Sequence, residues 1–370
     1  MALQFTRDVQ VILEDPTASF RWEIPVLDGF SFSQAINASE ITVNEAGITS
    51  RRARLLFNDA LAPVEWSFST YARPQLVASP NLVRPVEEAL WALWAGGDTY
   101  ADATAIFTST AVSPAVPVNA CDATSNTFNL NGSNISSFAS GWKVYFQFVP
   151  TGGTAQTYIC NDIVVNSVTM DFDIDGIATL QWSGFGATIT DNGAGVVAAT
   201  ETSASELDIT DTNSFIRNRI STVDITRTDG SPDVTYTVVL TGGSINFENN
   251  ISYLTPEELG KINIPIANIT GSRAISGNLT CYLDTGASKS AQLFNDLVSD
   301  TETVRNTVDM AINVGGTGTP SISFDMQFAH LEVPVINVED LLTLDIAFHG
   351  QPQSGNVDNT NEATIVYRAS

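Results

Sequence analysis

Cysteine and histidine are scarce in this chain. Its 370 residues include 3 cysteines and 2 histidines. The cysteines, at positions 121, 160 and 281, are odd in number and far apart, so the sequence predicts neither a disulfide framework nor a zinc site. His330 and His349 lie in no metal-binding or nucleophile-elbow motif. We therefore expect no enzyme, and we assign no catalytic residue, no cofactor and no metal ligand.

Basic residues are also few. The chain has 16 Lys and Arg against 41 Asp and Glu, a net charge of −25. Such a surface repels phosphate backbones, which argues against specific capture of DNA or RNA. It remains compatible with a passage for DNA, because a wall that must not bind its cargo needs the same sign of charge. The alternative interpretation is that the charge only keeps the protein soluble.

Long apolar runs are absent. No stretch of about 18 apolar residues occurs, so we expect no membrane insertion by this chain. The first residues lack the apolar core of a secretion signal. The sequence is instead rich in Val, Ile, Thr and Phe within alternating stretches, which favours strands. A length of 370 residues exceeds one typical core and indicates two domains.

Several elements can be located from local patterns. Residues 66–71, 142–149 and 308–314 alternate or cluster as strands do. Residues 85–94 and 290–298 have helical periodicity, and Gly96 and Gly97 end the first helix. Asp28 and Gly29, between residues 20–27 and 30–33, are typical of a hairpin turn. Residues 39–64 are predicted to form a long projecting loop or hairpin.

The two halves share four landmarks in the same order. The first pair of landmarks is 34 positions apart in one half and 32 in the other, and the second pair is 26 and 27 apart. The landmarks are Asn37, Tyr71, Gly153 and Thr179 in the first half, and Asn250, Tyr282, Gly316 and Thr343 in the second. This order indicates an internal duplication. We expect one unit over 1–200, with an insertion at about 105–140, and a second over 201–370.

Residues 171–176 resemble the start of an EF-hand loop. The loop requires a bidentate Glu at its twelfth position, where this chain has Trp182, so we do not predict a calcium site. With a period of two, Asp171, Asp173 and Asp175 share one face of a strand, and the apolar residues between them share the other. Three like charges on one face require open water. The face is either an ordinary solvated surface or a negative wall around a channel.

Longer segments resemble a known family. Residues 40–47, 52–71 and 249–256, with further similarity over 264–282, closely resemble bacteriophage tail tube proteins, in particular the duplicated kind of long non-contractile tails. The resemblance implies a mainly β fold of two tandem sandwich or barrel units, each with one flanking helix. It also implies homotrimers that imitate hexameric rings, a barrel of inner strands around a lumen, and rings that stack into a tube for DNA. The family carries no catalytic residues.

This resemblance sets the expected sites and partners. We expect the lumen to be lined by Asp171, Asp173, Asp175, Glu339, Asp340 and Asp345. We expect contacts between subunits or rings from Glu40, Glu45, Arg51, Arg52 and Arg54. Partners would be further copies of the chain, a tape measure protein and tail tip or terminator proteins, with DNA passing through unbound. The protein would be part of the virion tail and assemble in the host cytoplasm.

Two other functions stay open on sequence grounds. One is a carbohydrate-binding or adhesive β-module of a tail tip, which would use surface aromatic residues. We expect the tryptophans within apolar patterns to belong to the core instead; they are Trp66, Trp91, Trp94, Trp142 and Trp182. The other is a polysaccharide-degrading enzyme, which would need two essential carboxylates.

Overall fold

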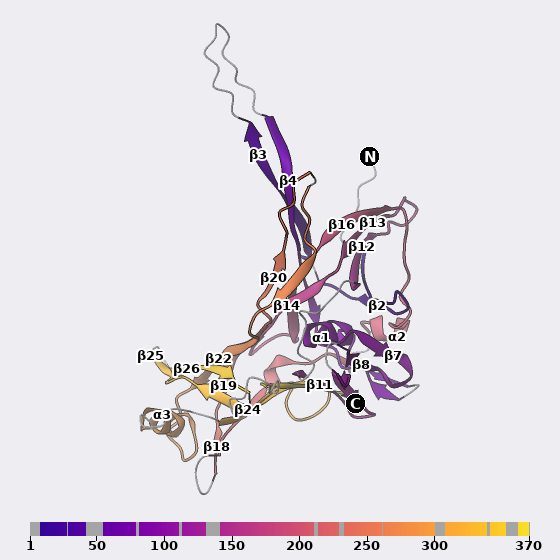
Figure 1. Ribbon diagram of the computed structural model, residues 1–370. Helices are drawn as coiled ribbons and strands as arrows, with labels where there is room; N and C mark the ends of the chain where they lie inside the picture. The colour runs from indigo at the N-terminus through magenta and orange to yellow at the C-terminus, as the bar shows by residue number, and fades with distance from the viewer. Residues whose placement is uncertain are drawn as a thin grey trace, which may run out of the picture.

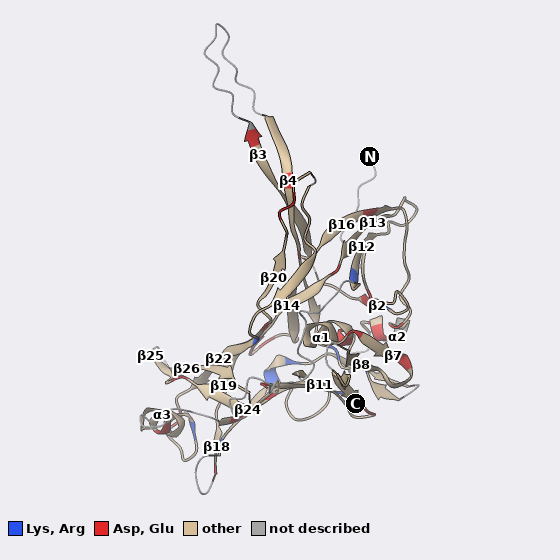
Figure 2. Cartoon of the chain, in the orientation of Figure 1, with Lys and Arg blue, Asp and Glu red and all other residues tan. Residues whose placement is uncertain are grey.

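The computed structural model describes residues 8–27, 29–41, 55–78, 81–110, 113–130, 141–210, 214–228, 233–260, 262–299, 308–338, 341–352 and 362–369. The described chain is mainly β, as predicted (Figure 1). Nearly all pairings between strands are antiparallel, which suits a sequence whose strands alternate between apolar and polar residues. Figure 2 shows that Asp and Glu are spread over the described chain, whereas Lys and Arg occur at few places.

Eight strands form one continuous array, here called the central array. Its order is β3-β4-β15-β14-β19-β22-β26-β25. The strands are β3 (Ser31–Ile41), β4 (Leu55–Tyr71), β15 (Thr179–Gly186), β14 (Val164–Asp173), β19 (Leu240–Glu248), β22 (Ala274–Tyr282), β26 (Leu342–Gly350) and β25 (Val335–Val338). The two ends of the array, β3 and β25, each have a neighbour on one side only within the described chain.

Two further five-stranded arrays cover the central array. The first has the order β16-β13-β12-β1-β2, from Thr188–Gly193, Gln156–Asn161, Lys143–Phe148, Val9–Glu14 and Arg21–Ile24. The second has the order β27-β24-β23-β17-β18, from Thr364–Arg368, Ser321–Leu331, Val308–Val314, Thr222–Arg227 and Val234–Thr237. If the strands of each array are numbered 1 to 5 in chain order, both arrays have the spatial order 5-4-3-1-2. The second array also joins the central array, because β24 pairs with β26 at its end.

The remaining elements are short. Strands β10 (Asn119–Cys121) and β11 (Ser125–Asn129), from the predicted insertion, extend the second array, since β11 pairs with β27 and β10 pairs with β11. The others are β5 (Leu76–Val77), β6 (Leu82–Val83), β7 (Thr99–Ala101), β8 (Ile106–Ser109), β9 (Val116–Pro117), β20 (Ile251–Leu254), β21 (Ala267–Thr270), α1 (Glu88–Ala95), α2 (Ala204–Leu207) and α3 (Ser290–Ser299), with 3-10 turns at Asp102–Thr104 and Asn218–Ile220.

Three of the four landmark pairs lie at matching places in this topology. The first pair does not, because Asn37 lies within β3 whereas Asn250 follows the end of β19. Tyr71 ends β4 and Tyr282 ends β22. The glycines at 152–153 join β12 to β13, and those at 315–316 join β23 to β24. The two threonines stand at the starts of β15 and β26. The strands that carry the landmarks also have matching neighbours: β4 lies between β3 and β15, and β22 lies between β19 and β26.

The hairpin predicted at Asp28 and Gly29 is wrong. Strand β2 pairs with β1, while β3 pairs with β4 in a different sheet. Between them the chain crosses over: Val26 bridges to Thr70, and the Leu27 amide donates to the Ser69 carbonyl at 2.8 Å. Gly29, with φ of +99°, makes a bend that connects two layers rather than a turn between paired strands.

Helix α1 begins at Glu88, later than predicted, and ends where Gly96 adopts the left-handed conformation, with φ of +89°. It packs against the central array, and all eight of its residues are buried. The Trp91 ring contacts Trp182 of β15 and Phe247 of β19, with centroids 5.0 and 5.4 Å apart. An amphipathic pattern predicts a helix with one buried face, whereas the structure buries the opposite face of α1 as well. Helix α3 fits the prediction of an amphipathic helix better, since Leu293 is buried and Phe294 and Leu297 pack against the core. Val298, which the pattern places on the same side, is exposed instead.

The start of α1 carries a buried carboxyl group. Glu87 is 1% exposed and accepts hydrogen bonds from the Tyr367 hydroxyl at 2.6 Å and the Arg73 amide at 3.1 Å. Burial raises the pKa of Glu87 to about 7, since a charged carboxylate loses its hydration there. The next residue, Glu88, is also buried, and its pKa is raised by burial although Arg84 lies 2.5 Å away.

We predict that Glu87→Gln alters how stability depends on pH. In the wild type, the stability due to protonated Glu87 is full below about pH 4.5 and is lost as pH rises through about 7. A glutamine does not ionise, so the variant should gain relative to wild type between pH 5 and pH 8, by an amount on the order of 3 kcal/mol. Thermal unfolding at both pH values checks this, with Glu65→Gln as an exposed control. An equal difference in Tm at the two pH values would contradict it.

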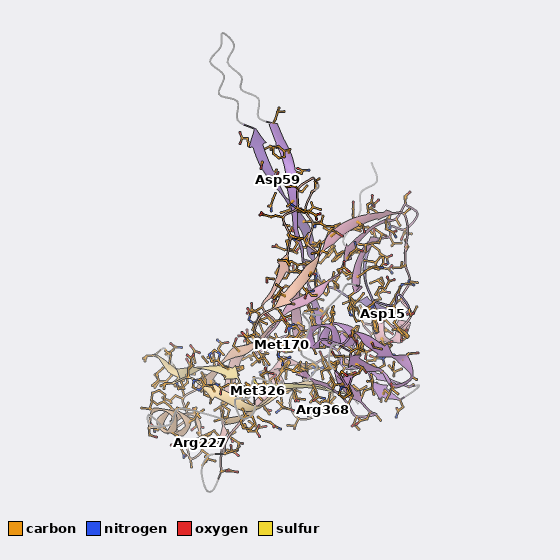
Figure 3. The ribbon with its side chains drawn as sticks, viewed as in Figure 1. Asp15, Asp59, Met170, Arg227, Met326 and Arg368 are labelled. Carbon is orange, nitrogen blue, oxygen red and sulfur yellow. The ribbon has the colours of Figure 1, made fainter. Side chains whose placement is uncertain are left out.

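A hairpin arm projects from the body (Figure 1). Strands β3 and β4 pair out to Ile41 and Leu55, and the structure thereby confirms the projection predicted for 39–64 as a hairpin in its described part. Asp59 lies on this arm (Figure 3). A second hairpin, β20–β21 with its loop, leans on the arm. There the Leu61 amide donates to the Asn263 carbonyl at 2.8 Å, and the Asn263 amide donates to the Asp59 carbonyl at 3.1 Å.

Candidate functional site

One face of the central array is polar along its whole width. Apolar side chains of its six inner strands, such as Trp66, Met170 and Ile346, are buried beneath the array. Because side chains alternate along a strand, the residues between them point to the opposite side. That side, here called the polar face, consists of Ser31, Ser33, Glu65, Ser67, Ser69, Ser167, Thr169, Asp171, Asp173, Thr179, Gln181, Ser183, Ser244, Asn246, Glu248, Ser276, Asn278, Thr280, Thr343, Asp345 and His349, with a few apolar residues at its margins.

Hydrogen bonds between side chains run across the strands of this face. In strand order they join Ser31 to Ser67 at 2.9 Å, Ser183 to Ser167 at 2.7 Å, Thr169 to Asn246 at 2.9 Å, Ser244 to Asn278 at 2.6 Å and Thr280 to Asp345 at 2.8 Å. Such pairs confirm that these side chains share one face and stabilise the sheet by about 0.2–1 kcal/mol each. They also hold short polar groups against the sheet, so the surface is even and hydrated.

Charge on the polar face has one sign. Its carboxylates are Glu65, Asp171, Asp173, Glu248 and Asp345, and none of the residues that make up the face is Lys or Arg. Like charges at this density create a negative potential over the face, and solvent screens it over about 8–10 Å. A polyanion near this surface is repelled, and the face offers it no cation to bind.

The predicted acids divide into three groups. Asp171, Asp173 and Asp345 lie on the polar face. Strand β14 ends at Asp173, so Asp175 stands in the following turn, where it lies 3.6 Å from Arg219 rather than on the strand face as predicted. Ile174 likewise is 45% exposed and not packed beneath the strand. Glu339 and Asp340 lie outside the described residues.

Two acids of this face were not predicted from the sequence. Glu65 lies opposite Ser33, and Glu248 lies opposite Ser167. Alternation within residues 64–70 and 243–248 indicates this placement, because Val64 and Trp66 on either side of Glu65 are buried, as is Phe247 before Glu248. The acids predicted from the sequence come from residues 171–175 and 339–345, and neither glutamate lies in these segments.

Of the predicted contact residues, the structure describes one, which lies on the arm. Glu40 is exposed near the end of β3, opposite Leu56. Glu45, Arg51, Arg52 and Arg54 lie outside the described residues. Nearby, the described part of the arm carries apolar side chains with little cover: Leu55, Leu56 and Phe57 are 63%, 68% and 51% exposed.

Strand β25 is an uncovered apolar edge. Val335, Ile336 and Val338 are 61%, 42% and 79% exposed, and Leu341 and Leu342 continue the patch at 62% and 41%. An exposed apolar edge strand invites pairing with another strand, and proteins that remain monomeric usually protect it with charge or proline. This edge carries neither within β25.

Other kinds of site are not evident in the described part of the chain. Its residues include no group of three or more His, Cys, Asp or Glu side chains that could hold a metal ion. None of the helices described is long and apolar enough to cross a membrane. All six tryptophans are at most 2% exposed, which confirms the prediction that Trp66, Trp91, Trp94, Trp142 and Trp182 belong to the core.

Comparison with known proteins gives an independent indication. The family model described as phage tail tube protein matches residues 83–350. The tail tube protein pb6 of Escherichia phage T5 is 27% identical over 380 residues, covering 95% of this chain and 73% of that protein. The matched region includes most strands of the central array and most strands of each covering array. The chain therefore belongs to the family of phage tail tube proteins.

Proposed function

We propose that this chain is the structural subunit of a phage tail tube, that three copies close into a ring with pseudo-sixfold symmetry, and that the rings stack around a lumen for DNA. The observation that carries the proposal is the polar face: a sheet eight strands wide, acidic and free of Lys and Arg, with both edges open in the described chain. Membership of the tail tube family supports the same conclusion.

Ring closure follows from the two edges. Pairing β25 of one copy with β3 of the next would satisfy both and cover the apolar patch on β25. Three copies would supply three times eight, 24 strands, and a closed barrel has no remaining edge. A cyclic arrangement of this kind uses one heterologous contact repeated until the ring closes.

The pseudo-sixfold symmetry rests on the duplication that we propose for 1–200 and 201–370. It is supported by the matching strand order of the two covering arrays and by three of the four landmark pairs, which lie at matching places. Strands β3, β4, β15 and β14 would then correspond to β19, β22, β26 and β25. The insertion after α1 departs from this symmetry, because β11 pairs with β27 of the other half.

The lumen would be formed by the polar face. Its carboxylates repel the phosphates of passing DNA, and its short hydroxyl and amide side chains hold water rather than bases. We extend the proposal to a tape measure protein and tail tip or terminator proteins as further partners, with assembly in the host cytoplasm. No described residue is assigned a catalytic role.

Electron microscopy of the concentrated purified protein in negative stain tests the proposal. Long hollow tubes are expected. Closed oligomers that bind sugars would instead support the adhesive module, and turnover of a polysaccharide would support the enzyme. The burial of every tryptophan already weakens the adhesive alternative, since tryptophan is unavailable as a stacking surface for sugars.

A further inference from the structure

The two histidines of the chain lie directly opposite each other on neighbouring strands. The sequence has 2 histidines, and no local motif joins them. In the fold, β24 pairs with β26, and the register sets His330 against His349. Residues opposite each other in an antiparallel pair point to the same side of the sheet, with Cβ atoms about 4.5–5.5 Å apart. The two ring centroids are 6.5 Å apart, with an angle of 24° between the ring planes.

A carboxylate contacts one of the two rings. The Oε1 atom of Glu332 lies 3.1 Å from Nε2 of His349, and these side chains are 58% and 49% exposed. A carboxylate that accepts the proton of one imidazole nitrogen leaves the other nitrogen as an electron-pair donor. Histidines that bind metals usually have such a partner, because it fixes the ring and makes the binding nitrogen more basic. The arrangement is therefore that of a metal ligand with its supporting carboxylate.

The surroundings of the histidine pair favour a cation. His349 belongs to the polar face, and its neighbour on β22 is Ser276. The carboxylates of that face, such as Glu248, create a negative potential that concentrates cations near the surface. None of the residues that make up the face is Lys or Arg. A metal ion at the pair would therefore meet no basic side chain of this face.

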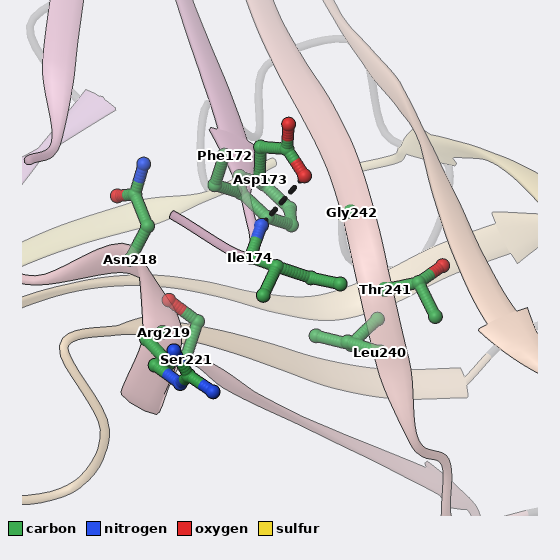
Figure 4. A pocket seen from close by; sticks show the side chains of 9 residues that line it. All are labelled: Phe172, Asp173, Ile174, Asn218, Arg219, Ser221, Leu240, Thr241 and Gly242. Atoms are coloured by element: carbon green, nitrogen blue, oxygen red, sulfur yellow. Dashed lines mark hydrogen bonds between the residues drawn. The ribbon is translucent and has the colours of Figure 1, made fainter. Parts of the chain in front are cut away.

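A pocket at the end of β14 provides a comparison (Figure 4). It has a volume of about 220 Å³, and none of the 9 residues that line it is a histidine. The Asp173 carboxylate accepts a hydrogen bond from the Ile174 amide at 2.6 Å, and Arg219 lies 3.6 Å from Asp175. A guanidinium group is always charged and repels a metal ion. The pocket is thus less suited to a cation than the histidine pair.

We propose that His330 and His349 bind one divalent transition-metal ion, with water completing its coordination and Glu332 positioning the His349 ring. Imidazole suits Zn²⁺, Cu²⁺ and Ni²⁺, whereas Mg²⁺ and Ca²⁺ prefer oxygen ligands. Metal–nitrogen bonds of about 2 Å would place the ring centres roughly 5–6 Å apart, so a small rotation of the two rings completes the site. The site has two protein ligands and differs in this respect from a closed cage of three or more.

The bound ion would link two arrays of strands. The three residue pairs between β24 and β26 join the second covering array to the central array. An ion held by one histidine from each strand acts as a cross-link at this junction. Because the unfolded chain does not hold the two histidines together, the ion stabilises the folded state by mass action. The site is a property of the single chain and goes beyond the proposed tube.

Calorimetric titration of the purified, untagged and unassembled chain with Ni²⁺ or Zn²⁺ tests the site. A Cys121→Ser background removes the one native thiol that is not buried. We expect one ion per chain, no displacement by excess Ca²⁺, and binding at least tenfold weaker in His330→Gln or His349→Gln. Absence of binding to the wild type, or equally tight binding to the double variant, would overturn the proposal. Neither result depends on whether tubes form.

Substitution of Glu332 separates positioning from coordination. Glu332→Gln should weaken binding by about 10–100-fold, as loss of such a supporting carboxylate usually does. Electron paramagnetic resonance of the Cu²⁺ complex should still show two imidazole nitrogens in this variant and only one in His349→Gln. Glu248→Gln on the polar face and Asp173→Asn in the pocket are the matched controls and should bind as the wild type does. Equal weakening by either control would show that general negative charge holds the ion and would overturn the assignment.

Thermal unfolding tests the cross-link between the arrays. Saturating Ni²⁺ should raise the Tm of the wild type by a few degrees and leave that of the double histidine variant unchanged. In the absence of metal the two proteins should have similar Tm values, because both histidines are at least partly exposed. A Tm that does not respond to a bound ion would contradict the cross-link.

Discussion

The double substitution Ile336→Asp and Val338→Asp is expected to abolish tube formation while the chain stays folded. Both side chains belong to β25, lie on the face opposite the polar face, and are 42% and 79% exposed. In the proposed ring they would pack beside Phe32 and Ile36 of the neighbouring β3. Two carboxylates there would be buried without partners, which costs several kcal/mol at each of the three contacts in a ring.

Electron microscopy and sedimentation measure this effect, and thermal unfolding shows whether the monomer is intact. Because the substituted side chains are partly exposed in the single chain, Tm should fall only slightly. Val196→Asp serves as the matched control for adding an acid to an exposed valine. Normal tubes from the double variant would show that β25 is not a ring contact, and would leave closure of the sheet without its main support.

Reversal of charge on the polar face is expected to have the second large effect. Replacing Asp171, Asp173, Glu248 and Asp345 with lysine changes the local charge by two at each position. The lumen would then attract phosphates instead of repelling them, and each phosphate contacted would make binding more sensitive to salt. Phages carrying this variant should assemble tails of normal length yet deliver DNA much more slowly. Tubes formed from the variant should bind short duplex DNA at low salt and release it at high salt.

The control for charge reversal replaces acids on the covering arrays. Asp191 and Asp233 are exposed and lie away from the polar face, on β16 and just before β18. Lysine at these positions should leave both delivery and DNA binding unchanged. Neutral variants of the four acids, with Asn or Gln, should fall between wild type and the lysine variant. Delivery at the wild-type rate from the lysine tube would exclude the polar face as the lumen.

The sequence predicted those features that depend on local periodicity. Strand β23 was located at its observed bounds, and the tryptophans were assigned to the core. Asp171 and Asp173 were placed on one strand face because side chains alternate there. The mainly β class followed from composition, and the family from longer segments that resemble tail tube proteins.

Features that depend on contacts distant in sequence were not predictable. Residues 20–33 contain a strong hairpin signal, but β2 and β3 belong to different sheets because the chain crosses onto β4 at Val26. Helix α1 has an amphipathic pattern, yet strands from both halves enclose it, and Glu88 is buried with Arg84. Glu248 could be assigned to the polar face only once the register of β19 against β14 was known.

A cryo-electron microscopy reconstruction of the assembled tube tests the central claim most directly. We predict three chains in each ring, with the polar faces inward and β25 of each chain paired to β3 of the next. Six chains in a ring, or a bore lined by surfaces other than the polar face, would contradict it.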